Sequence, residues 1–335
     1  MSGGRNDNWR MTTLNDSMKA RARGVWMGQL VGDALGTTVE FQRRAAISTR
    51  YPDGLREVVG GGPFNCAVGQ VTDDSELALA LARSLVASGA DFDGVAQAYV
   101  AWRWSSPIDI GGTTARAFGL RDTVTAERLW DHSQRLNGDP SNQANGALMR
   151  VSPLAIYGAT MAPGRLAELS RLDAKLSHPA VVCQEANVAF TAAIAAGIRG
   201  GDAQGVYASA LAAVDTDVGR ECGVHGWLVA AETDEPDFDK WGMGWVRLAL
   251  QNAFYRLLRA RTFEEAVVDT VMAGGDTDTN GCIVGALCGS VFGELDIPVQ
   301  WREAVLTCRP RRPAVYWTTD ARELAVQLLE RGLTG

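Results

Sequence analysis

The sequence predicts an all-α protein that folds as a single domain, and three observations support this. Apolar residues recur at helical spacing in one segment after another from Ser17 onward, and no segment shows a convincing strand alternation. No internal repeat divides the 335 residues. Two acidic motifs, at residues 70–76 and 274–281, lie far apart, and they can share one site only if the whole chain forms one domain.

The N-terminal part is expected to be a tail followed by a glycine-containing helix. Residues 1–17 are polar, which predicts a flexible tail or, alternatively, an arm that reaches a partner. Apolar residues then follow on one side of a helix that continues to Gly36, with glycines at helix-packing intervals. Residues 42–70 contain turns and three consecutive glycines, which predicts irregular structure, either a lid over a ligand or a plain connector.

Helical periodicity and helix-forming composition predict most of the remaining elements. The predicted helices cover residues 75–88, 92–104, 181–198, 246–258, 263–272, 282–292 and 320–331. Residues 202–239 are charged and lose their periodicity past Asp215, which predicts a long loop.

Composition narrows the class of protein. With 46% apolar and 21% charged residues, the chain is an ordinary globular sequence. The net charge of −7 and the lack of a basic cluster make a nucleic-acid partner unlikely. The six cysteines form no CxxC pair, so we expect free thiols in a reducing compartment. The N-terminus lacks the apolar region of a signal peptide and no membrane-spanning run stands out, so we expect a cytoplasmic protein without a membrane partner.

The motif at residues 274–281 concentrates oxygen ligands ahead of an apolar helix. Asp276 and Asp278 stand two positions apart, so they converge on one point only in a turn, which the paired glycines before them permit. The helix that follows is shorter than the ~20 residues that span a bilayer, which predicts a core helix. Glycine recurs at every fourth position, which predicts a face that another helix approaches closely: Gly281, Gly285, Gly289 and Gly293.

The motif at residues 70–76 also opens a helix. Asp73 and Glu76 have the spacing of a capping box with the aspartate as N-cap, and the simplest interpretation is that both motifs are helix caps. Each motif nevertheless supplies more acids than one cap needs, and clustered like charges are costly unless a cation neutralises them. Oxygen ligands without nearby His or Cys favour Mg²⁺ or Mn²⁺, and less strongly Ca²⁺.

Other polar and aromatic positions each have a functional and an ordinary interpretation. Asp33 lies in an apolar helix and needs a partner if it is buried, and Asp109 has the spacing of a cap before a helix. The loop at residues 145–150 precedes a helix whose backbone amides can hold phosphate. His178 opens a helix, either as a chemical group or as a cap. Trp245 suits either base stacking or core packing.

In their order and spacing these motifs resemble the ADP-ribosylglycohydrolase family, nearest to the bacterial dinitrogenase reductase-activating (ADP-ribosylarginine hydrolase) branch. The resemblance covers residues 20–301. It implies that residues 18–335 form one compact orthogonal helical domain with two divalent cations, Mg²⁺ or Mn²⁺, in a cleft. The resemblance rests on residues 32–36 with Glu40, 60–64, 70–74, 109–114, 145–150, 177–179 and 275–279.

The resemblance also implies roles for individual residues. Glu40 is similar to an acid that assists water in some branches, and Asp109 to the aspartate beside the scissile ribose, so both are the expected catalytic residues. The expected metal ligands are Thr72, Asp73, Asp74, Asp276, Asp278 and Thr279. The expected ADP-ribose contacts are Gly112, Asn145, Gly146, His178 and Trp245.

Three functions are compatible with this resemblance. The first is a metal-dependent hydrolase that removes ADP-ribose from modified arginine in a protein substrate and releases ADP-ribose. The second is the same chemistry on serine-linked ADP-ribose, O-acetyl-ADP-ribose or ADP-ribosylated nucleic acid. The third is a binding or immunity protein that blocks an ADP-ribosyltransferase toxin through its N-terminal tail.

Overall fold

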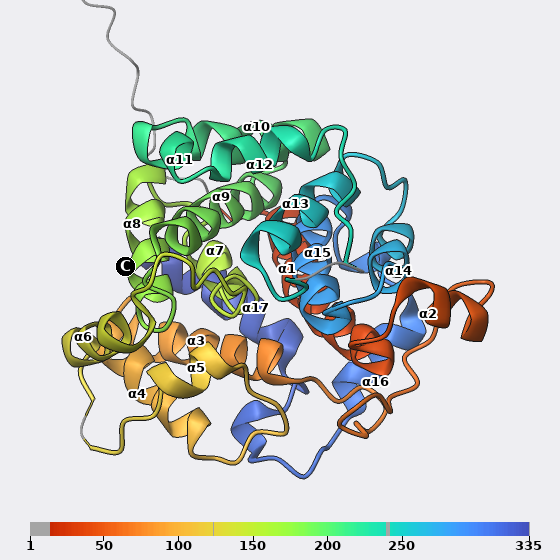
Figure 1. Cartoon of the computed structure of the whole chain (residues 1–335), viewed down its shortest axis with the longest axis horizontal. Coiled ribbons are helices and arrows are strands. Elements are labelled where there is room, and N and C mark those ends of the chain that lie inside the picture. Colours follow the sequence, from red (N-terminus) through yellow and green to blue (C-terminus); the bar gives the residue numbers. More distant parts are fainter. Residues whose placement is uncertain (1–13, 123, 239–241, 335) are drawn as a thin grey trace, which may run out of the picture.

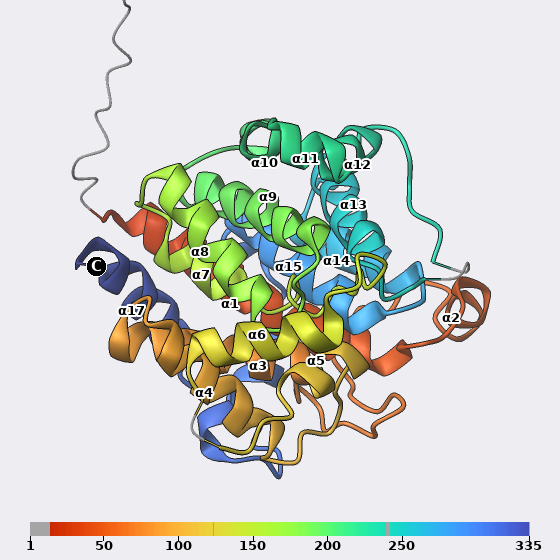
Figure 2. The same ribbon diagram turned by 60° about the vertical axis from the view of Figure 1, so that its left-hand side comes forward.

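The computed structural model describes residues 14–122, 124–238 and 242–334, and this part of the chain is all-helical, as predicted (Figures 1 and 2). Its β-type pairing is limited to three isolated bridges. The α-helices are α1 (Asp16–Gly36), α2 (Arg44–Arg50), α3 (Asp73–Ser88), α4 (Phe92–Arg103), α5 (Gly112–Ala117), α6 (Ala126–Asn137), α7 (Ser152–Tyr157), α8 (Pro163–Lys175), α9 (Val181–Ile198), α10 (Ala203–Val214), α11 (Asp217–Glu221), α12 (Val224–Ala230), α13 (Val246–Leu257), α14 (Phe263–Met272), α15 (Thr277–Phe292), α16 (Val299–Thr307) and α17 (Ala321–Thr334). Three short 3-10 helices are Thr37–Val39, Glu294–Asp296 and Ala314–Tyr316.

The centre of the molecule is an antiparallel pair formed by α1 and α15. Every residue from Gly24 to Gly36 and from Thr277 to Ser290 is buried. Figures 1 and 2 show the pair enclosed by other helices, with α10, α11 and α12 side by side at one end of the molecule and α3 to α6 at the other.

Glycine faces glycine along the whole length of this pair. A Cβ atom built on Gly28 would lie 2.1 Å from the carbonyl oxygen of Gly285, and one built on Gly285 would lie 2.0 Å from that of Gly28. Even close carbon–oxygen contacts in proteins are about 3.3–3.6 Å, so the two backbones touch at a distance that no side chain tolerates. The predicted glycine face is therefore confirmed for Gly281, Gly285 and Gly289, and its partner is α1, whereas Gly293 ends the helix as its C-cap. The other facing pairs are Gly24 with Gly289 and Gly32 with Gly281.

Helix α9 is the one helix in the described ranges that is long and apolar enough to cross a membrane, although no such run was expected from the sequence. However, 89% of its apolar window is buried inside the protein. It packs against α8, α10 and α15, as a core helix does.

Several sequence expectations need correction. Residues 42–70 are not wholly irregular, because α2 lies within them. Likewise α10, α11 and α12 all lie within residues 202–239, where a long loop was predicted. Helices α11 and α12, which follow Asp215, are too short to show a clear periodicity. All six cysteines are free, as predicted. Most of the predicted tail at residues 1–17 lies outside the described residues. The first described helix, α1, begins at Asp16, and Asn15 is its N-cap residue.

Replacing Gly285 with alanine tests the contact between the two central helices. Because the new methyl group would meet backbone rather than a flexible side chain, α1 and α15 must separate. We expect the free energy of unfolding, measured by urea denaturation, to fall by about 2–3 kcal/mol.

The matched control is Gly226→Ala, at an exposed position of α12 where an added Cβ meets nothing within 4 Å. This change should stabilise the protein by up to about 1 kcal/mol, the helix-propensity difference between alanine and glycine. Equal stability of the two variants would show that α1 and α15 are not in backbone contact.

Candidate metal centre and cleft

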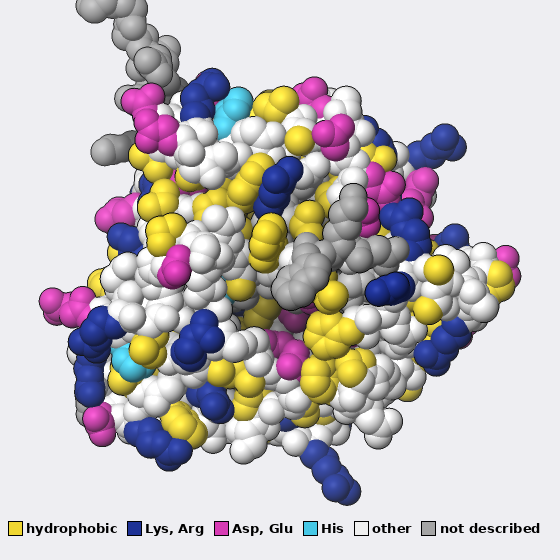
Figure 3. All heavy atoms as spheres, viewed as in Figure 1, with side chains coloured by type: hydrophobic (Ala, Val, Ile, Leu, Met, Phe, Trp, Pro, Cys, Tyr) yellow, Lys and Arg dark blue, Asp and Glu magenta, His cyan; other side chains and the backbone are white. Residues whose placement is uncertain are grey.

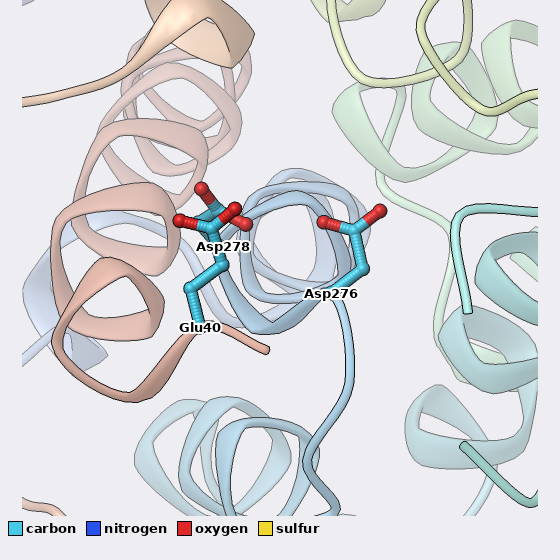
Figure 4. A group of neighbouring side chains, drawn as sticks. All are labelled: Glu40, Asp276 and Asp278. Carbon is cyan, nitrogen blue, oxygen red and sulfur yellow. The ribbon is translucent and has the colours of Figure 1, made fainter. Parts of the chain in front are cut away.

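The central helix pair brings three carboxyl groups together. Ligand oxygens of Glu40, Asp276 and Asp278 all lie within 4.8 Å of one another, and Figure 4 shows their side chains around the start of α15. Asp276 is the N-cap residue of this helix, and its side chain makes no cap hydrogen bond. The turn before it depends on Gly274 and Gly275, whose φ angles of 83° and 80° favour glycine, as the sequence predicted.

Backbone hydrogen bonds fix the segment after Glu40 against the turn that carries Asp276. The amide of Phe41 donates to the carbonyl of Gly275 at 2.8 Å, and the amide of Gly275 donates to the carbonyl of Gln42 at 2.9 Å. Phe41 itself has a φ of 61°, uncommon outside glycine. Glu40 and Asp276 are therefore held together by main chain on both sides.

The second acidic motif joins the same cluster through Asp33 of α1. The Asp33 carboxylate accepts hydrogen bonds from the amides of Thr72 at 3.0 Å and Ser75 at 3.1 Å. A side chain from another helix therefore satisfies the first turn of α3. The capping-box prediction for Asp73 and Glu76 is wrong, because Thr72 is the N-cap residue and Asp73 lies inside the helix.

Asp109 reaches the cluster from the loop before α5. Its carboxyl group and that of Asp73 affect each other's pKa, and its carboxylate accepts from the amide of Ile110 at 2.7 Å. The expectation that Asp109 caps α5 is not met, since Gly111 is the N-cap residue. Asp109 instead faces the other acids.

The cluster contains six buried carboxyl groups and the half-buried Asp109. In the part of the chain that the structure describes, no ion pair joins any of them to Lys or Arg. The buried members are Asp33, Glu40, Asp73, Asp74, Asp276 and Asp278. Such a concentration of acids is unfavourable in their charged form unless a cation is present.

Burial raises the pKa of every carboxyl group in the cluster. The pKa of Asp33 rises to about 6, and that of Glu40 rises to about 8, where the charges of Asp276 and Asp109 add to the effect of burial. For the other members the direction is the same and burial is again the main cause. These are Asp73, Asp74, Asp109, Asp276 and Asp278.

The donor set suits a hard divalent cation. All candidate ligands are oxygens, and two buried carboxylate oxygens, Oε2 of Glu40 and Oδ1 of Asp74, lack a hydrogen-bond partner among the described residues. The Thr72 hydroxyl, which lies within 3.0 Å of Asp33 and 2.9 Å of Asp74, adds another oxygen. The residues present therefore fit a metal centre.

A cleft of about 320 Å³ opens directly above the acids. Figure 3 shows acidic side chains at the bottom of a hollow near the middle of one face. Nine of the predicted site residues line this cleft: Glu40, Asp73, Asp109, Gly112, Asn145, Gly146, His178, Asp276 and Thr279. Thr72, Asp74 and Asp278 are buried beneath it and belong to the cluster rather than to the lining.

Asn145 connects one wall of the cleft to the acids. Its side-chain amide donates to Oδ2 of Asp276 at 2.7 Å, and its backbone amide donates to the carbonyl of Gly244 at 3.0 Å. Trp245, the next residue along, does not line the cleft; it is the N-cap residue of α13 and its residue surface is 51% exposed.

Two polar groups important to this geometry were missing from the predicted site. Asp33 was recognisable as an acid in an apolar helix, but its role as a cap for α3 depends on tertiary structure. Arg312 could not be found from the sequence. It forms a two-pronged ion pair with Glu76, at 2.7 and 2.8 Å, and donates to the carbonyls of Ser105 and Ser106, which begin the loop that carries Asp109.

An all-helical fold with a buried cluster of oxygen ligands beneath a polar cleft is the frame of a protein that could hold a hard cation next to a bound ligand. A family model described as ADP-ribosylglycohydrolase matches residues 14–334, and the chain belongs to this family. The resemblance inferred from the motifs is therefore confirmed.

Known relatives cover nearly the whole chain. The chain is 30% identical to ADP-ribosyl-[dinitrogen reductase] glycohydrolase of Rhodospirillum rubrum, over 85% of this chain and 90% of that protein. It is 27% identical to ADP-ribosylarginine hydrolase Tri1 of Pseudomonas putida, over 93% and 78%. A solved structure titled "ADP-ribosylglycohydrolase-related protein complex" superposes with a TM-score of 0.74 at 27% identity, covering 95% of this chain and 100% of that one.

The raised carboxyl pKa values predict how the stability of the metal-free protein depends on pH. Because the folded acids hold protons that the unfolded chain releases above about pH 4, stability should fall as the pH rises towards 8. In a chelator, the free energy of unfolding at pH 8 should be lower than at pH 5.5 by about 1 kcal/mol or more.

Millimolar Mg²⁺ or Mn²⁺ should restore this loss at pH 8 and have less effect at pH 5.5, because protons compete with the cation for the same carboxylates. Ca²⁺ and Na⁺ at equal ionic strength serve as controls for selectivity and for general screening. Stability at pH 8 that does not respond to any divalent cation would contradict a metal centre at this cluster.

The buried ion pair between Glu76 and Arg312 predicts that substituting Arg312, which lies outside the cleft, strongly lowers the free energy of unfolding. Arg312→Met leaves the carboxylate of Glu76 buried without its partner, which should cost about 3–5 kcal/mol of unfolding free energy. The double variant Glu76→Gln, Arg312→Met should be more stable than Arg312→Met alone. Arg165→Met, which removes an exposed ion pair with Glu168, is the control and should cost no more than about 1 kcal/mol.

Proposed function

We propose that the protein is a metal-dependent hydrolase that cleaves the bond between ADP-ribose and a modified protein side chain, most favourably arginine. The observation that carries this proposal is the convergence of the two distant acidic motifs on one buried cluster at the bottom of a cleft. The arginine linkage is supported by the similarity to the ADP-ribosylarginine hydrolase Tri1, at 27% identity.

Two divalent cations, Mg²⁺ or Mn²⁺, would be held by the two motifs in this proposal. The proposed ligands are Thr72, Asp73, Asp74, Asp276, Asp278 and Thr279. When bound, such cations would orient the ribose hydroxyls and lower the pKa of a water molecule. The hydrogen bond from Asn145 would orient the carboxylate of Asp276 towards this task.

The reaction adds the hydroxyl of water to C1 of the ribose and returns a proton to the departing nitrogen. Asp109 and Glu40 are the proposed proton carriers, because both line the cleft and burial raises the pKa of each carboxyl group. Positive charge grows on the ribose ring as the C1–N bond breaks, and the surrounding carboxylates stabilise it.

The rest of the cleft would bind the ADP part of the substrate. Gly112, Asn145, Gly146 and His178 are the proposed contacts, and the glycines leave room for a phosphate or a sugar against the backbone. Trp245 is not part of this proposed set, because a base stacked on it would lie outside the lining of the cleft.

The proposal is tested by measuring ADP-ribose release from arginine-linked, serine-linked and O-acetyl substrates by the full-length protein. We expect release from ADP-ribosylarginine with Mg²⁺ or Mn²⁺ and none in a chelator. Asp276→Asn should lower this activity by about 100-fold or more.

Asp131→Asn, at an exposed acid on α6, is the matched control and should retain full activity. Release of ADP-ribose from the serine-linked or O-acetyl substrate instead would support the proposed hydrolase activity but replace arginine as the proposed linkage. Failure to release ADP-ribose from any of the three, with the metal bound, would refute the proposed function.

A further inference from the structure

A fully buried arginine organises the wall of the cleft opposite the acids. Arg150 lies after the Asn145–Gly146 loop, and its Nη1 donates to the carbonyl of Gly146 at 2.9 Å and to the hydroxyl of Ser177 at 2.7 Å. Its Nη2 donates to the carbonyl of Asp173 at 3.0 Å, and its Nε lies 3.3 Å from the Asp173 carboxylate. The guanidinium therefore holds both the loop before α7 and the turn that leads into α9.

This arrangement is rigid because aromatic rings enclose it. The guanidinium carbon of Arg150 lies 4.7 Å from the ring centroid of Tyr99 and 5.5 Å from that of Phe118. The hydroxyl of Tyr99 donates to the other oxygen of the Asp173 carboxylate at 2.7 Å. Arg150 thus has no freedom to release Ser177 without breaking a buried ion pair.

The direction of the hydrogen bonds follows from the chemistry of arginine. A guanidinium can only donate, so the Ser177 hydroxyl must accept from Arg150. Its own proton has one acceptor among the described residues, Nδ1 of His178 at 2.8 Å. The Ser177 oxygen could also accept from an Nδ1–H, but its own proton would then have no acceptor among the described residues. The arrangement that satisfies every group has Nδ1 as the acceptor, and a neutral His178 then carries its proton on Nε2.

Nε2 of His178 is the end of this chain of hydrogen bonds, and His178 is one of the residues that line the cleft. It has no hydrogen-bond partner among the described residues, and His178 is only 1% exposed. A Cβ atom built on Gly146 would lie 3.1 Å from Nε2 and 3.0 Å from the hydroxyl of Thr114, so the missing side chain of Gly146 leaves space beside the ring. A buried donor without a partner at the edge of a cleft indicates an absent acceptor.

Electrostatics favours the neutral ring. Burial, with the positive charges of Arg150 and Arg116 adding to it, lowers the pKa of His178 well below its ordinary value of 6.5. At neutral pH the imidazole therefore offers a dipole rather than a charge.

We propose that Arg150 and Ser177 are positioning residues that lock His178 in its Nε2–H tautomer, so that it presents a neutral donor to an oxygen of bound ADP-ribose. The nature of the ligand rests on the proposed function, whereas the tautomer does not. The acceptor is a diphosphate oxygen or a ribose hydroxyl, which share the same hydrogen-bonding chemistry. Because the tautomer is already fixed in the free protein, ligand binding does not incur the free-energy cost of shifting His178 to the tautomer that binds.

The tautomer can be measured directly by ¹⁵N NMR of the imidazole nitrogens in the full-length protein labelled at histidine. The chain has only three histidines, and a His178→Gln sample assigns the signal. We expect a single Nε2–H form of His178 between pH 6 and 8, and a mixture of tautomers in Ser177→Ala. A wild-type signal from the Nδ1–H form or from an imidazolium at pH 7 would overturn the proposal.

Binding provides the second readout. Ser177→Ala should weaken ADP-ribose binding, measured by calorimetry with Mg²⁺, by about 3–10-fold, the range expected for one modest hydrogen bond. ADP as a second ligand locates the acceptor, since an equal loss indicates a group that both ligands contain, the diphosphate or the adenosine ribose, and a loss for ADP-ribose alone indicates the second ribose, which ADP lacks. Unchanged affinity for both ligands would overturn the proposal.

Ser170→Ala is the matched control for general loss of stability. Ser170 is also fully buried, and its hydroxyl donates to the carbonyl of Leu166, away from the cleft. This variant should leave the tautomer and the affinity unchanged. If wild-type protein does not bind ADP-ribose at all, the ligand assignment fails together with the proposed function, while the NMR spectrum of the free protein still decides the tautomer.

Discussion

The backbone contact between α1 and α15 is the constraint on which the site depends. Three pairs of facing glycines let the two helices touch, and one turn beyond the last pair Gly36 lies against the backbone of Thr277 and Asp278. The end of one helix therefore lies beside the start of the other, and each contributes acids there. A side chain at any facing position would separate the helices and with them the carboxyl groups.

The buried acids impose a second constraint, which is electrostatic. A cluster of carboxyl groups under a cleft is stable as a set of neutral acids or as the ligands of a cation, and the neutral form becomes harder to maintain as the pH rises. Two buried arginines beside the walls of the cleft are committed elsewhere: Arg150 pairs with Asp173 and Arg312 with Glu76. Both arginines support the walls of the cleft, but neither neutralises the acidic cluster beneath it.

Much of this fold was predictable because the informative signals are local. Helical periodicity located α1, α3, α9 and α17 but did not single out α6, α8 and α10. The four-residue spacing of glycines from Gly281 onward revealed a packing face, and the acidic motifs marked the cluster. The signals that failed depend on distant partners. Asp73 and Glu76 have the spacing of a capping box, but Asp33 of α1 caps α3 and Glu76 pairs with Arg312, 236 residues away. The spacing of residues in the sequence cannot reveal whether the first turn of a helix receives its hydrogen-bond acceptor from a nearby residue or from a distant helix.

The most direct measurement of the central claim is an anomalous-scattering experiment on crystals grown with Mn²⁺. The account predicts anomalous peaks, two in the proposed arrangement, among the carboxylates of Asp73, Asp74, Asp276 and Asp278, with α1 and α15 in glycine-to-glycine contact beneath them. Crystals that show this helix pair intact but no manganese within reach of these carboxylates would contradict the account.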